Sequence, residues 1–87
     1  MKLEFQGSNG KRHKIGEPKT IKEAYIIMYK FIKNHHYKSY YTRVNFYPDE
    51  LEFDVGSYNE FFYLNQLCED WREQLNHLCL ERNEKDA

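Results

Sequence analysis

Acidic residues recur along one short segment of the chain, where their spacing could present negative charge to a partner. Glu50, Glu52 and Asp54 occupy every second position, so in a β-strand they share one face at a spacing of roughly 6.6 Å. The outer side of a helix expected after them carries a second acidic group: Glu69, Asp70, Glu73, Glu81 and Glu84. These carboxylates predict a surface that docks on a basic protein. A solvated outer face is the alternative interpretation.

Basic residues are concentrated near the other end of the chain. Lys11, Arg12 and Lys14 follow an Asn-Gly turn signal, and Lys30 and Lys33 could extend the same patch from the exposed side of a helix. Such a cluster can bind phosphates, so nucleic-acid binding is the alternative function. The other interpretation is a hairpin whose lysines protect an edge strand. The sequence contains no zinc-finger spacing and no RNA-binding aromatic signature that would favour nucleic acid.

Metal binding and nucleophilic catalysis are less well supported by residue spacing. Asp70, Glu73 and His77 would share a helix face, but such residues are common on solvated helices and a site would need more ligands. Cys68 and Cys79 fall on an apolar stripe and should be inert thiols. In a helix they would lie roughly 16 Å apart, too far for a disulfide. We expect no catalytic residues, no metal and no other cofactor.

The composition describes a small folded domain. The 87 residues are 40% hydrophobic and 31% charged, enough for one core spanning residues 1–87 and too few for two. The net charge of −1 hides an asymmetry: residues 1–43 hold ten Lys and Arg against three Asp and Glu, and residues 44–87 hold three against eleven. The two halves could bind charged partners or neutralise each other. Without a long apolar run or a signal sequence, a cytoplasmic location and no membrane partner are expected.

The periodicity predicts an α+β domain of the order ββαβββα. Alternation and the Asn9-Gly10 turn indicate strands at 2–6 and 11–15. Thr20 and Glu23 form a capping box at the start of a helix that ends near Asn34. Strands are expected at 40–47, 51–55 and 60–64, and Asn65 as the cap of a second helix. The whole should be an antiparallel sheet with two helices packed on one face.

The turn at Pro48 fixes a register for the third and fourth strands. Pairing Phe46 with Leu51 places Val44 opposite Phe53 on the core face, and Arg43 opposite Asp54 on the other face. Tyr41 and Tyr47 then remain exposed candidates for a partner surface. Tyr40 is expected to face the core. The predicted core contains Leu3, Phe5, Tyr25, Met28, Phe31, Val44, Phe46, Phe53, Trp71, Leu75 and Leu78.

The stretch YYTRVNFYPDELEFDVGSYNEFFYL, residues 40–64, resembles small uncharacterised proteins carried by phages and prophages of Gram-positive bacteria. With the preceding capped helix, the similarity covers most of the chain. The pattern is structural, so it assigns a role to no single residue. The resemblance implies a protein that binds and blocks host machinery, for example a CRISPR nuclease or another nucleic-acid-binding enzyme. We therefore expect a non-catalytic protein-binding module whose partner presents a basic surface.

Overall fold

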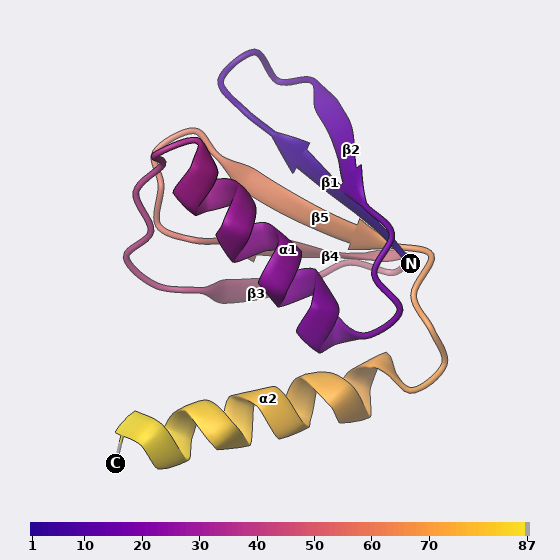
Figure 1. Ribbon diagram of the computed structural model, residues 1–87. Helices are drawn as coiled ribbons and strands as arrows, with labels where there is room; N and C mark the ends of the chain where they lie inside the picture. Colours follow the sequence, from indigo (N-terminus) through magenta and orange to yellow (C-terminus); the bar gives the residue numbers. More distant parts are fainter. Residues whose placement is uncertain (87) are drawn as a thin grey trace.

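The computed structural model describes residues 1–86, and side chains for residues 1–78. The elements follow the expected order, and the fold is α+β (Figure 1). They are β1 (Lys2–Gln6), β2 (Arg12–Gly16), α1 (Ile21–Asn34), β3 (Arg43–Phe46), β4 (Glu50–Asp54), β5 (Phe61–Asn65) and α2 (Trp71–Asp86). In the described part of the chain, no helix is long and apolar enough to cross a membrane.

All strand pairs in the five-stranded sheet are antiparallel, and the strand order is β2-β1-β5-β4-β3. The last strand in the chain, β5, therefore lies in the centre and joins the two hairpins. Buried side chains alternate along β1 and β4, and with Phe62 and Leu64 of β5 they form one core face. The opposite face of the same strands is polar, as is usual for an antiparallel sheet with one solvated side.

Helix α1 covers the core face because its apolar residues recur at helical spacing. Ile21, Ala24, Met28 and Ile32 are buried against the sheet. The start of the helix is capped as predicted, since the Glu23 amide donates to Oγ1 of Thr20 at 3.1 Å. The Glu23 carboxylate accepts from the backbone amide of Lys19 at 2.6 Å. A capping box would use the amide of Thr20, the next residue.

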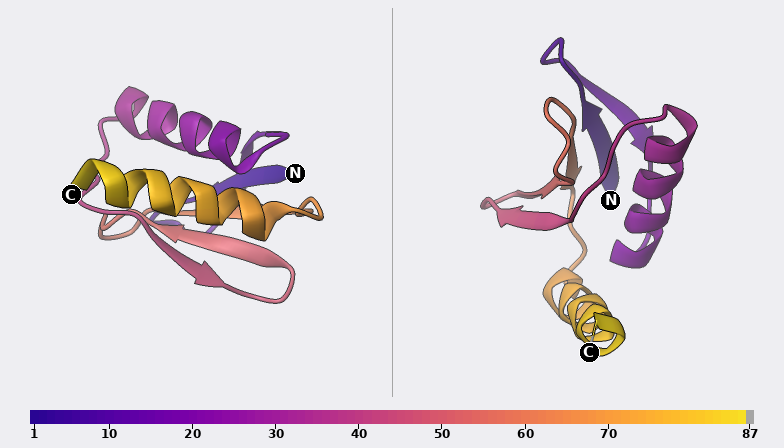
Figure 2. Two further views of the ribbon diagram at one scale, coloured as in Figure 1. Left: turned by 90° about the horizontal axis from the view of Figure 1, so that it is seen from below. Right: turned by 90° about the vertical axis from the view of Figure 1, so that its left-hand side faces the viewer.

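Helix α2 lies beside α1, below the part of the sheet that contains β3 (Figures 1 and 2). Its side chain Leu75 is buried in the core. The Gln74 side chain accepts a hydrogen bond of 2.8 Å from the amide of Ile21, the first residue of α1. The Trp71 ring lies 6.0 Å from the Phe46 ring, measured between centroids. These contacts attach α2 to both α1 and β3.

The predicted register of β3 and β4 is confirmed. Arg43, Val44, Asn45 and Phe46 pair with Asp54, Phe53, Glu52 and Leu51 in that order. The core prediction is also confirmed for ten residues, of which five are buried in the core and five are half-buried and pack against it. The buried residues are Leu3, Phe5, Met28, Phe53 and Leu75; the half-buried ones are Tyr25, Phe31, Val44, Trp71 and Leu78.

Three local predictions are wrong. Phe46 is 63% exposed, because β3 is an edge strand whose core side α2 covers only in part. Tyr40 is 70% exposed. The backbone amides of Tyr40 and Tyr41 both donate to the Val55 carbonyl, so the regular pairing with β4 does not extend to these residues and β3 begins only at Arg43. Asn65 does not cap a helix: it is the last residue of β5, paired with both β1 and β4, and α2 begins six residues later at Trp71.

Candidate functional site

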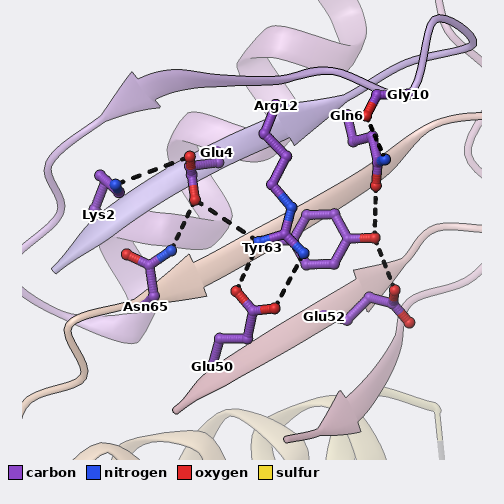
Figure 3. A network of polar contacts seen from close by, with 9 residues as sticks. All are labelled: Lys2, Glu4, Gln6, Gly10, Arg12, Glu50, Glu52, Tyr63 and Asn65. Atoms are coloured by element: carbon purple, nitrogen blue, oxygen red, sulfur yellow. Dashed lines mark hydrogen bonds and ion pairs between the residues drawn. The ribbon is translucent and has the colours of Figure 1, made fainter.

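The open face of the sheet carries a network of polar side chains centred on Tyr63 of β5 (Figure 3). Tyr63 points away from the helices, yet it is only 6% exposed. The guanidinium of Arg12 from β2 lies over its ring, 3.6 Å from the centroid, in a cation–π contact. An arginine on an edge strand thus reaches across β1 to cover the central strand.

Arg12 also binds acidic side chains of two other strands. Its guanidinium donates to both carboxylate oxygens of Glu50 at 2.8 and 3.1 Å, and lies 3.9 Å from the Glu4 carboxylate. The hydrogen bonds to Glu50 raise the pKa of Arg12 further above its ordinary value. A fork-shaped pair of this kind is the strongest ion-pair geometry available to an arginine.

The hydroxyl of Tyr63 completes the network on its other side. Its oxygen lies 2.8 Å from the side-chain oxygen of Gln6 and 2.9 Å from the carboxylate of Glu52. Burial raises the pKa of Tyr63 to about 12, and the hydrogen bond to the negative Glu52 raises it as well. The hydroxyl therefore stays protonated and holds β1, β5 and β4 together.

The predicted acidic row lies on this face, but each of its carboxylates has an internal partner. Glu50 binds Arg12, Glu52 accepts from the side chain of Asn45 at 2.9 Å, and Asp54 accepts from the amide of Gly56 at 2.9 Å. Cations and carboxylates alternate across the face. The cations are Lys2, Arg12, Lys14 and Arg43, and the carboxylates are Glu4, Glu50, Glu52 and Asp54. The open face is thus mixed in charge.

The other predicted acids lie at the start of α2. Glu69, Asp70 and Glu73 are exposed. Asp70 accepts a hydrogen bond of 2.9 Å from the side chain of Gln74. The side chains of Glu81 and Glu84 lie outside the described residues.

The predicted basic set is divided between two sides of the molecule. Arg12 and Lys14 pair in register with Gln6 and Glu4, so their side chains belong to the open face. Lys30 and Lys33 are exposed on α1, which covers the opposite face. Lys11 is exposed at the hairpin end. The fold therefore does not gather the five cations on one face.

The residues considered for metal and thiol chemistry lie in α2 and in the loop before it. Among them, no group of three His, Cys, Asp or Glu side chains is placed to hold a metal ion. Cys68 is a half-buried thiol in the loop before α2, with the Gln74 side-chain amide 3.5 Å from its sulfur. The side chain of Cys79 lies outside the described residues.

Exposed aromatic side chains lie along β3 and its flanks. Besides Phe46, these are Tyr40, Tyr41 and Tyr47. An open hollow of about 360 Å³ adjoins Phe46 and is lined on its other side by α2 residues. We call Arg43, Phe46, Tyr47, Trp71, Arg72, Leu75 and Asn76 the β3 edge surface. Sequence alternation selected Tyr41 and Tyr47 as exposed, but it missed Phe46 and the hollow, which depend on where α2 lies.

No family model matches the chain, and no curated protein or solved structure matches it significantly.

Proposed function

We propose that this protein is a non-catalytic protein-binding module that contacts its partner through the β3 edge surface. One observation carries the proposal: Phe46, a large apolar ring at 63% exposure, lies beside an open hollow and is followed directly by exposed Tyr47. Large aromatic rings beside a hollow are typical of the residues that dominate binding energy at protein interfaces. They can bury much area with little loss of conformational freedom.

The size of the domain supports binding over catalysis in a deep cleft. Its accessible surface is 6102 Å², so a standard interface of about 800 Å² per partner would occupy a modest part of it. The hollow at Phe46 is open to solvent, and its lining combines Phe46, Trp71 and Leu75 with Arg72 and Asn76. Aromatic side chains and arginine are enriched at protein interfaces.

The resemblance to phage proteins indicates the class of partner. A host defence protein, such as a CRISPR nuclease, remains the predicted target. The exposed carboxylates of Glu69 and Glu73 at the start of α2 would orient the module on a basic partner. The row Glu50, Glu52 and Asp54 remains a candidate contact, although a partner would compete there with Arg12, Asn45 and the Gly56 amide.

Affinity capture from a Gram-positive bacterial lysate, with quantitative mass spectrometry, tests the proposal. Phe46→Ser and Tyr47→Ser remove the exposed rings from the β3 edge surface. Tyr58→Ser is the matched control, because Tyr58 is 92% exposed and lies past the other end of β4. We expect one specific partner that is lost with the first two variants and retained with Tyr58→Ser. A partner that all three variants retain would show that binding uses another surface.

A further inference from the structure

Strand β3 has one side of its backbone without a strand partner. The sheet order ends at β3, so its pairing is with β4 alone. The Tyr47 amide donates to the Glu50 carbonyl at 3.0 Å, which makes these two residues a hydrogen-bonded pair. Bonded and non-bonded pairs alternate in an antiparallel ladder. The backbone amides and carbonyls of Val44 and Phe46 therefore point outward, where an added strand would bind them.

The opposite edge of the sheet is protected in a way that β3 is not. Strand β2 carries Lys11, Arg12, His13 and Lys14 at or beside its edge, and its pairing with β1 shifts register between Leu3 and Glu4. Charged side chains and bulges are the usual means of blocking edge pairing. Strand β3 has a regular register and the sequence Arg-Val-Asn-Phe. Of the two edges, β3 is the one suited to accept a strand.

The side chains around this edge define what the added strand must carry. On the core side, the hollow beside Phe46 has Trp71 and Leu75 in its walls, so an apolar side chain fits there. On the open side, Arg43 lies 5.3 Å from the ring centroid of Tyr41. Arg72 lines the hollow itself and lies over Trp71. Within residues 1–78, neither Arg43 nor Arg72 has a carboxylate at ion-pair distance.

We propose that β3 binds, as a sixth strand of the sheet, an extended segment of the partner in which acidic and apolar residues alternate, separate from the basic surface that Glu69 and Glu73 would face. Backbone hydrogen bonds to Val44 and Phe46 would supply affinity; the hollow would take the apolar side chains, and Arg43 on the open side would meet the acidic ones. Self-pairing of β3 with a second copy is disfavoured, because it would place the positive charges of Arg43 and Arg72 from both copies along one interface, where they would repel each other. The inference rests on the proposed function and specifies its binding mode.

Synthetic ten-residue peptides test the proposal on the wild-type chain. The probe alternates glutamate with valine or leucine. One control replaces glutamate by lysine, and another is N-methylated at alternate residues so that one edge of the peptide cannot donate hydrogen bonds. Trp71 is the one tryptophan of the chain, so its fluorescence reports occupancy of the hollow. Amide hydrogen exchange of Val44 and Phe46, measured by NMR, reports backbone pairing.

We expect the acidic peptide to bind, to change Trp71 fluorescence and to slow exchange at Val44 and Phe46. N-methylation should weaken binding by about tenfold or more, since at least one to two backbone hydrogen bonds are lost. The lysine peptide should also bind more weakly than the acidic one. Val44→Pro removes an outward amide without removing a β3–β4 bond, so it should repeat the effect of N-methylation from the protein side.

Equal affinity for the acidic and N-methylated peptides, or no NMR response at millimolar acidic peptide, would overturn the strand-addition proposal. So would a dimer seen by analytical ultracentrifugation that Val44→Pro abolishes. These results leave the proposed function standing if a partner is still lost with Phe46→Ser. Conversely, peptide binding without any partner sensitive to Phe46→Ser would count against the proposed function and not against the strand-accepting edge.

Discussion

The guanidinium of Arg12 and the carboxylate of Glu50 are joined by two hydrogen bonds, although the residues are 38 positions apart in the chain. Arg12 belongs to the basic half of the sequence and Glu50 to the acidic half. The pair therefore cancels part of the charge asymmetry within the fold. It also places two predicted binding residues, one assigned to nucleic acid and one to a basic protein, in the same internal contact.

A double-mutant cycle on Arg12→Ala and Glu50→Ala should show a favourable coupling of ~0.5–1 kcal/mol in the free energy of unfolding, because the pair is bidentate and partly shielded. Urea denaturation of the four proteins measures it. The Lys14–Glu17 pair, 2.9 Å apart, is a suitable control, since both side chains are more exposed than those of Arg12 and Glu50. A coupling no larger than that of the control pair would contradict the structural role of Arg12.

Ionisation of Tyr63 should make the fold less stable at high pH. The folded pKa of about 12 exceeds the ordinary value of 10.0, so above pH 10 the unfolded chain releases this proton before the folded chain does. The stabilisation is complete below pH 10 and is lost as the pH rises toward 12. Urea unfolding between pH 9 and 12 should show this decline in the wild type.

Tyr63→Phe isolates that effect from the other groups that titrate in the same range. The variant should lose about 1 kcal/mol at neutral pH, because the hydroxyl no longer bonds to Glu52, and it should show a shallower decline above pH 10. Identical alkaline slopes for the two proteins would mean that Tyr63 titrates normally.

The local elements of this fold are predictable from sequence because local interactions determine them. The α1 stripe from Ile21 to Ile32 and the Thr20 cap depend on residues a few positions apart. The register of β3 and β4 follows from one tight turn and from alternation, which a one-residue slip would invert. In each case the information lies within about a dozen residues.

The candidate site was less predictable because its residues come together through strand order. Tyr63 is central only because β5 lies between β1 and β4, which places Arg12 and Glu50 within reach of it. Asn65 has a good capping side chain, but pairing with Lys2 and Glu50 and a 2.8 Å bond to Glu4 keep it in the sheet. Alternation placed Phe46 on the correct face, yet it could not show that α2 leaves the ring exposed.

Gly56→Ala should destabilise the protein by about 1 kcal/mol or more. Gly56 has a φ of +81°, which disfavours any residue with a Cβ. A Cβ at this position would also lie 2.9 Å from the Tyr41 ring. Thermal unfolding measures the loss. Gly10→Ala is the control, because its φ of +75° is similar while its Cβ would meet no atom within 4 Å. Equal losses for the two variants would show that the contact with Tyr41 contributes nothing.

Nucleic-acid binding, the alternative function, makes a separate prediction. If it holds, the affinity for DNA or RNA should fall steeply with salt, and Lys11→Ala, Lys30→Ala and Lys33→Ala should each reduce the salt slope by about one. Arg12 and Lys14 are unsuitable for this test, because they are paired with Glu50 and Glu17. Fluorescence anisotropy from 25 to 200 mM salt provides the measurement. We expect no binding that uses all three lysines, since the fold separates Lys11 from Lys30 and Lys33 on α1. A reduced salt slope in all three variants would contradict that expectation.

The acidic contact is best tested at the start of α2. Charge reversal at Glu50 or Glu52 would break bonds to Arg12 or Tyr63, so a lost partner could reflect a damaged fold. Glu69 and Glu73 are exposed, and no ion pair involves them within residues 1–78. Reversing both to Lys should cost no more than about 1 kcal/mol per residue in the free energy of unfolding, with the larger share at Glu73, which lies in the first turn of α2. If the partner is basic, the double variant should associate more slowly in surface plasmon resonance at low salt, with little change in the dissociation rate. An unchanged association rate would remove Glu69 and Glu73 from the binding surface and leave the aromatic β3 edge surface to account for recognition.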